Sequence, residues 1–222
     1  MARLDLAPAA GMLAPTFMGI SPQQFEALQQ RLRQPRRKAR TEPESESPFR
    51  SMAPTAPPVV LGIDPSLRGT GWGIIRADRN APALLGAGTL RCAASWPRSR
   101  CLVRIAAGLR DAIREHQPTT CAVEALFFAQ NLQTALLMGE ARGVCLLAAA
   151  EAGIDICEIA PRKVKQAVVG FGGAQKSAVA RMVQRMLGLA EAPEPDAADA
   201  LALALVHAQT LGRPTLEPVR RL

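Results

Sequence analysis

The chain has 222 residues, 48% of them hydrophobic, and its 27 Lys and Arg outnumber 19 Asp and Glu to give a formal net charge of +8. This length suits one domain with an extra segment, and the apolar content excludes disorder of the whole chain. No uninterrupted apolar run approaches the roughly 18 residues of a transmembrane helix, so we expect no membrane partner. The basic excess favours an acidic partner.

Residues 1–58 differ in composition from the rest of the chain. They hold nine of the 18 Pro residues, and six Lys and Arg between positions 31 and 40 precede three Glu between positions 42 and 46. Such segments rarely form a packed core, so we predict a mostly disordered basic tail. The tail could bind nucleic acid without sequence preference, direct the chain to an organelle or have no role, and translation could instead begin at Met52.

Alternating strands and helices are predicted from Val59 onward, from apolar runs for strands and from apolar residues spaced by three and four for helices. The predicted order is strands 59–64, 71–77 and 83–91, helix 98–116, strand 121–124, helix 132–152, strand 154–159 and helices 161–168, 174–187 and 195–210. Residues 211–222 follow as a short C-terminal tail. The order predicts an α/β domain over residues 59–210 with a mixed five-stranded sheet flanked by helices, as in ribonuclease-H-like folds.

Five Cys residues lie in this domain, at positions 92, 101, 121, 145 and 157. No pair has the CxxC spacing of a zinc site, and the number is odd. We therefore expect buried free thiols in a reducing compartment. Together with the lack of a signal-peptide pattern, this favours a cytoplasmic location, with an organelle as the alternative if the tail is a transit peptide.

Four carboxylates are placed to meet at one edge of the predicted sheet. Asp64 and Glu124 each end an apolar strand, and ligands of α/β sheets bind at the carboxyl ends of strands. Asp196 and Asp199 lie one turn apart at the start of a largely apolar helix. Oxygen ligands suit hard divalent cations, and two such ions about 3.5–4 Å apart can promote phosphodiester hydrolysis.

Most of these carboxylates also have a purely structural interpretation. Asp64 could cap the turn at Pro65, and Asp196 and Asp199 could complement the dipole of their helix. Glu124 is harder to explain in this way, because the apolar segment around it offers a carboxylate no partner. From the residues alone, a metal site and a structural role both remain open.

Residues 59–209 resemble the RuvC family of Holliday-junction resolvases, which are crossover-junction endodeoxyribonucleases. The resemblance rests on the order and spacing of seven short segments over about 150 residues, because each segment alone is weak. The segments are LGIDP (61–65), TGWG (70–73), VEALF (123–127), GEARG (139–143), VKQAVVG (164–170), QKS (175–177) and DAADALA (196–202). The family commonly has Gly-Ser where this chain has Ser66–Leu67 and often Tyr at Trp72, and neither departure changes an acid.

The resemblance implies a ribonuclease-H-like fold and Mg²⁺-dependent paired nicking of four-way DNA junctions in recombination and repair. It assigns catalysis and metal binding to Asp64, Glu124, Asp196 and Asp199, with two Mg²⁺ ions per site for which Mn²⁺ can substitute.

Three DNA-binding residues are also implied by the resemblance. Phe127 would stack on bases near the cut, and Lys165 and Lys176 would lie near the scissile phosphate. Phe127 could instead belong to the core, and either lysine could simply be solvated.

A homodimer is implied as well, with helix 132–152 at its contact and Gly139 and Gly143 allowing close approach. The two glycines could instead serve packing on their own sheet. A two-fold dimer suits a two-fold junction, because it presents two equivalent sites. The resemblance also implies that the protein works in a bacterial cytoplasm with a branch-migration helicase complex as a further partner.

Three other functions compete with this one. A sugar-kinase-like or actin-like ATPase could explain the glycines around Asp64, but such proteins need a second phosphate loop that this sequence does not show. A non-catalytic junction-binding dimer would be expected to lack an acid. A related ribonuclease-H-like nuclease acting on another structured nucleic acid is the third.

Overall fold

The computed structural model describes residues 56–78, 81–125, 132–211 and 220–222. The chain divides into two units, Met1–Arg50 and Ser51–Leu222, and every described residue belongs to the second. The predicted tail over residues 1–58 therefore falls almost wholly outside the described residues, and so does Phe127.

Six strands form one mixed sheet in the order β3-β2-β1-β4-β5-β6. Five of them are the predicted strands: β1 (Val59–Asp64), β2 (Gly69–Arg76), β3 (Ala83–Arg91), β4 (Thr120–Glu124) and β5 (Asp155–Ile159). The sixth, β6 (Arg220–Arg221), pairs antiparallel with β5, inside the segment predicted as a C-terminal tail. Strand β6 was not predicted, because two successive Arg residues have no apolar pattern.

The register of the central strands places the first two acids. β1 runs antiparallel to β2 and parallel to β4, and β4 runs parallel to β5. Ile63 lies beside Val123 in this register, so Asp64 and Glu124 end neighbouring strands. Both acids therefore lie at the edge formed by the carboxyl ends of the parallel strands, as the sequence predicts.

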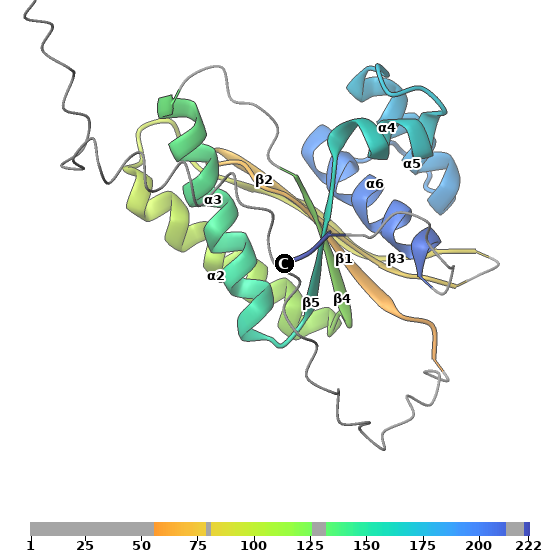
Figure 1. The fold of residues 1–222 in the computed structure, drawn as a ribbon, viewed down its shortest axis with the longest axis horizontal. Helices are drawn as coiled ribbons and strands as arrows, with labels where there is room; N and C mark the ends of the chain where they lie inside the picture. The colour runs from red at the N-terminus through yellow and green to blue at the C-terminus, as the bar shows by residue number, and fades with distance from the viewer. Residues whose placement is uncertain (1–55, 79–80, 126–131, 212–219) are drawn as a thin grey trace, which may run out of the picture. The chain divides into compact units, whose positions relative to one another are not determined.

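Helices cover both faces of the sheet (Figure 1), and each predicted helix of this domain is present with its ends shifted by at most two residues. On one face lie α2 (Arg98–His116) and α3 (Leu132–Glu151). On the other face lie α4 (Pro161–Val169), α5 (Lys176–Leu187) and α6 (Pro195–Thr210).

Each face of the sheet has its own core, because side chains alternate along the strands. Leu61 and Ile63 of β1 join the core that includes residues of α2 and α3, whereas Val60 joins the core that includes residues of α4, α5 and α6. α6 is buried over most of its length, since it packs against β1 and β2 in the middle of the sheet.

Glycine residues allow α6 to lie very close to the sheet. A Cβ atom at Gly62 would lie 1.9 Å from the Ala200 carbonyl oxygen, and one at Gly71 would lie 1.9 Å from the Asp196 carbonyl oxygen. No side chain fits these gaps, so both positions require glycine. Because Gly71 is the register partner of Asp64, the close contact brings the first turn of α6 to the edge that carries Asp64.

Helix α3 is long and apolar, but it packs as part of the domain. By length and composition alone, Leu132–Glu151 is apolar enough to cross a membrane. In the structure this helix packs on the sheet through one side, where Ala141, Cys145 and Ala149 are fully buried. All five Cys are free and buried, as predicted.

Candidate active site

Asp64 ends β1 just before a turn that is held by hydrogen bonds between Ser66 and Thr70. The buried Thr70 hydroxyl donates to the Ser66 carbonyl oxygen at 2.6 Å and accepts from the Ser66 N–H at 3.3 Å, which closes the turn between β1 and β2. Glu124 ends β4 beside this turn, and its carboxyl group hydrogen-bonds that of Asp64. The sheet thus presents two adjacent carboxyl groups at one edge.

The start of α6 brings the other two predicted acids to this edge. Asp196 lies in the first turn of the helix, after Pro195. Its Oδ2 atom lies 2.9 Å from the place that a Cβ at Gly69 would occupy, at the start of β2. Asp199 Oδ2 lies 2.9 Å from Lys176 Nζ, and this ion pair joins α6 to the first residue of α5.

Burial and mutual repulsion keep the carboxyl groups from ionising fully. Burial, then the neighbouring Glu124 and Asp199 carboxylates, raises the pKa of Asp64 to about 8. Burial also raises the pKa of Glu124, while the hydrogen bond from Asp64 opposes that rise. At neutral pH Asp64 is therefore protonated in the absence of a cation.

Both predicted lysines lie near these acids. A hydrogen bond to Asp199 raises the pKa of Lys176, and the charges of Asp64 and Asp196 add to this effect. Lys165 of α4 is half-buried, and its charge opposes the rise in the pKa of the Glu124 carboxyl group. The structure thus places both lysines at the site, while their contact with a phosphate stays a prediction.

The donor set of the site suits a hard divalent cation. All four predicted acids offer carboxylate oxygens, and a bound cation would relieve the repulsion from Glu124 and Asp199 that helps to raise the pKa of Asp64. Within the described segments, no three His, Cys, Asp or Glu side chains are gathered closely enough to hold a metal ion. The acids are instead arranged as the Asp64–Glu124 pair and the Asp199–Lys176 ion pair, with Asp196 beside them.

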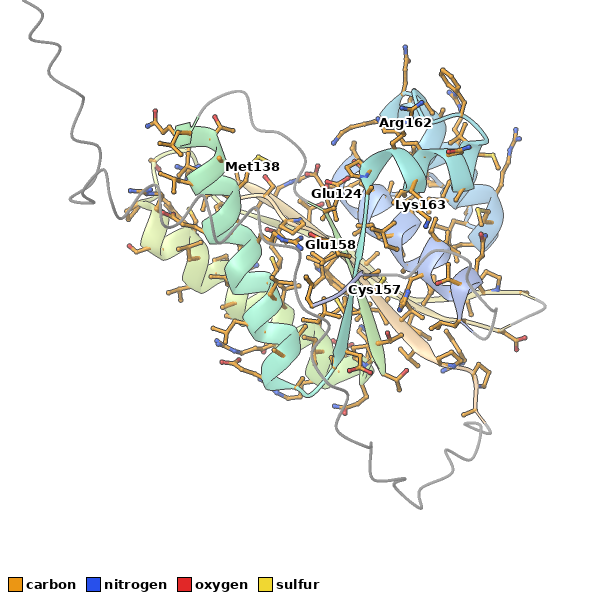
Figure 2. The ribbon with its side chains drawn as sticks, in the orientation of Figure 1. Glu124, Met138, Cys157, Glu158, Arg162 and Lys163 are labelled. Carbon is orange, nitrogen blue, oxygen red and sulfur yellow. The ribbon has the colours of Figure 1, made fainter. Side chains whose placement is uncertain are left out.

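Arg142 is a supporting residue that the sequence analysis did not assign. Its guanidinium group is almost fully buried and donates to the Glu124 carbonyl oxygen and to Glu158 Oε1, the latter at 2.7 Å. Figure 2 shows Glu124 and Glu158 on neighbouring strands between α3 and α4. Because Arg142 belongs to α3, this network fixes the end of β4 to the helix that packs over it. The sequence feature that could have indicated this role is that Arg142 is the one Lys or Arg within the apolar α3.

Comparison with known proteins matches the chain to one family. A family model described as Crossover junction endodeoxyribonuclease RuvC matches residues 60–207. The protein of that name from Chloroflexus aggregans is 49% identical over 158 residues, which are 71% of this chain and 95% of the relative. The one from Moorella thermoacetica is 49% identical over 151 residues, which are 68% of this chain and 90% of the relative.

A solved structure agrees with these matches. The structure described as T. thermophilus RuvC in complex with Holliday junction substrate is 38% identical and aligns with a TM-score of 0.63, over 68% of this chain and 93% of that chain. Nucleases of this family are metal-dependent, which agrees with the donor set described above. The chain belongs to the RuvC family of crossover junction endodeoxyribonucleases and has the ribonuclease-H-like fold of that family.

Proposed function

We propose that this protein resolves four-way DNA junctions by paired symmetric nicks, using Mg²⁺ held by Asp64, Glu124, Asp196 and Asp199. The observation that supports this most strongly is that the hydrogen-bonded pair Asp64–Glu124, the ion pair Asp199–Lys176 and Asp196 lie at one edge of the sheet. The solved relative from T. thermophilus is described as a complex with Holliday junction substrate, which favours the same substrate here.

Each group at the edge has a separate task in this proposal. When bound, two Mg²⁺ ions, or Mn²⁺ in their place, act as Lewis acids and lower the pKa of the attacking water. Asp64 must release the proton that it holds in the metal-free protein, so that all carboxylates can act as ligands. Arg142 orients Glu124 through its carbonyl oxygen. Lys176 and Lys165 offer ammonium donors to phosphate oxygens beside the acids.

Helix α3 supports a homodimer as the working form. Leu132, Leu136 and Leu147 are 76%, 57% and 52% exposed, and a Cβ at Gly139 or Gly143 would meet nothing within 4 Å. Spacings of four, three, four and four residues place these positions on one side of the helix. A second copy of α3 can approach closely over the glycines, and the two-fold dimer would present two equivalent sites to the junction.

Three further parts of the proposal rest on the family resemblance. Phe127, which follows β4 and lies outside the described residues, would stack on bases near the cut. A branch-migration helicase complex would deliver the junction. The protein and this helicase complex would act in the bacterial cytoplasm.

A nicking assay on a synthetic four-way junction tests the proposal. The full chain with Mg²⁺ is expected to cut two opposed strands at symmetric positions and to leave a duplex of the same sequence intact. The Asp64→Asn variant is expected to bind the junction without cutting it, because binding depends on phosphate contacts. Binding without cutting by the unaltered chain, in Mg²⁺ and in Mn²⁺, would favour a non-catalytic binder. Equal cutting of duplex would favour a nuclease for another substrate.

A further inference from the structure

The hairpin formed by α4, α5 and the loop between them is strongly basic. Residues 161–187 contain six Lys and Arg and no Asp or Glu, so they contribute +6 to a chain whose net charge is +8. Three of the four lysines of the whole chain lie here. The six cations are Arg162, Lys163, Lys165, Lys176, Arg181 and Arg185, and all except the half-buried Lys165 are exposed.

An aromatic side chain stands in the middle of this basic hairpin. Phe171 is 68% exposed, and it lies in the loop Gly170–Gly173, directly after α4. Gly170 ends α4 with a φ of 84°, a conformation that favours glycine. A Cβ at Gly173 would lie 2.8 Å from Phe171 Cε1, so one edge of the ring lies close to backbone that has no side chain.

Arg162 packs against the same loop from the first turn of α4. A Cβ at Gly172 would lie 2.7 Å from Arg162 Cγ, so this glycine lets the arginine stem lie along the loop. Among the described residues, no carboxylate forms an ion pair with Arg162, so its charge is free for a ligand.

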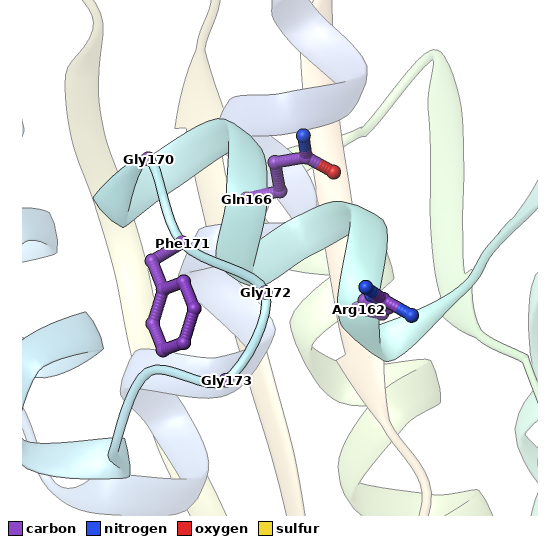
Figure 3. Close-up of a pocket in the computed structure, with 6 residues that line it drawn as sticks. All are labelled: Arg162, Gln166, Gly170, Phe171, Gly172 and Gly173. Carbon is purple, nitrogen blue, oxygen red and sulfur yellow. The ribbon is translucent and has the colours of Figure 1, made fainter.

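A cavity of about 470 Å³ lies between these groups (Figure 3). Phe171, Arg162 and Gln166 line it together with the three loop glycines. The lining offers an aromatic face, a guanidinium fork and an amide, and each matches one part of a nucleotide. The aromatic face can stack on any base, the guanidinium can bind a phosphate, and the amide can hydrogen-bond a base edge.

We propose that Phe171, Arg162 and Gln166 form a subsite for one unstacked nucleotide of the DNA strand that enters the active site. Its position supports this occupant, because the loop leads directly into Lys176, whose Nζ is 2.9 Å from Asp199. Lys165, in the same turn of α4 as Gln166, acts electrostatically on Glu124. The subsite deepens the proposed junction cleavage and rests on it, and it is separate from Phe127, which follows β4.

Substitution of Phe171 with a matched control tests the subsite. Val103 of α2 is also 68% exposed, lies on the opposite face of the sheet and serves as the control position. Without divalent metal, Phe171→Ala is expected to weaken binding of the full chain to a four-way junction about tenfold, as when one stacked base is lost. Val103→Ala is expected to leave the dissociation constant unchanged. Thermal unfolding of both variants checks that each one folds.

A Phe171→Trp variant gives a direct readout of stacking. It is expected to restore tight binding, and its added indole fluorescence should be quenched by the junction more strongly than that of the unaltered chain. If the unaltered chain cuts junctions but Phe171→Ala binds as well as Val103→Ala, or the added indole is not quenched, the subsite is wrong and the proposed function stands. An unaltered chain that neither binds nor cuts the junction overturns both.

Discussion

The basic side chains of α2 and those of the α4–α5 hairpin are similar in number but differ in their surroundings. α2 has five Arg, and three of them form ion pairs with carboxylates of α2 or α3. The pairs are Arg98–Glu140 at 3.0 Å, Arg110–Glu151 at 2.8 Å and Arg114–Asp111 at 3.2 Å. The hairpin has six cations and no acid of its own, and its Lys176 pairs with the site residue Asp199.

This difference shows that net charge alone does not locate a nucleic-acid surface. A cation that is paired with a neighbouring carboxylate adds little to the field felt by a phosphate, whereas a run of cations without acids attracts one. The Arg-rich composition of the chain is therefore less informative than the absence of acids over residues 161–187. In our proposal the hairpin and the adjoining acids form the DNA-binding side of the molecule, whereas three arginines of α2 pair with carboxylates of α2 or α3.

The largest effect is expected at the acids that the hairpin adjoins. Asp64→Asn should lower the rate of junction cleavage at least about 1000-fold, because a divalent cation contributes several kcal/mol of charge stabilisation. The same substitution at Asp111 of α2, a 68% exposed acid paired with Arg114, should leave the rate unchanged. Single-turnover cleavage with labelled junctions measures both rates, and equal rates for Asp64→Asn and Asp111→Asn would remove Asp64 from the site.

The next largest effect is on stability, where breaking a buried ion pair is compared with breaking an exposed one. Arg142→Leu removes the buried guanidinium group that pairs with Glu158 and donates to the Glu124 carbonyl oxygen, and should lower the free energy of unfolding by about 3–5 kcal/mol. Arg110→Leu breaks the exposed pair with Glu151 and should leave the free energy of unfolding almost unchanged, because solvent screens this pair. Urea denaturation of the two variants measures the difference. A similar small loss for both would mean that Arg142 does not hold the end of β4.

The pH dependence of stability tests the charge state of the acids without metal. The pKa of Asp64 rises from its ordinary value of 3.8 to about 8 on folding, so the native state binds more protons than the unfolded state between these values. Stability of the metal-free protein should therefore fall as pH rises from about 4 to about 8. Asp64→Asn should flatten this fall, and thermal unfolding in a chelator measures it. A variant that loses stability as steeply as the unaltered chain would contradict the raised pKa of Asp64.

Much of the fold was predictable because apolar patterning sets it directly. The apolar run of β1 and the spacing of Leu102, Ile105 and Leu109 in α2 are examples of the patterns that predicted the element order, with bounds within two residues. The meeting of Asp64 with Glu124 followed from the rule for carboxyl ends of parallel strands.

Other features depend on packing between distant segments, which no local pattern shows. The contacts of Arg142 join α3 to β4 and β5, so its partners could not be inferred from neighbours in sequence. The need for glycine at Gly62 arises from the backbone of Ala200, far along the chain. The exposure of Phe171 also needs the structure, because an isolated Phe between glycines could equally point inward.

The smallest effect, which is also the most direct test, is a change in the salt dependence of junction binding between two charge-matched variants. Arg162→Gln with Arg181→Gln removes two charges from the hairpin, and Arg110→Gln with Arg114→Gln removes two from α2. The slope of log K against log salt for junction binding should become less steep by about 1.8 for the hairpin variant, which is roughly 0.9 for each lost phosphate contact. The α2 variant should keep the slope of the unaltered chain. Equal slopes for the two variants would contradict the assignment of the hairpin as the DNA-binding side.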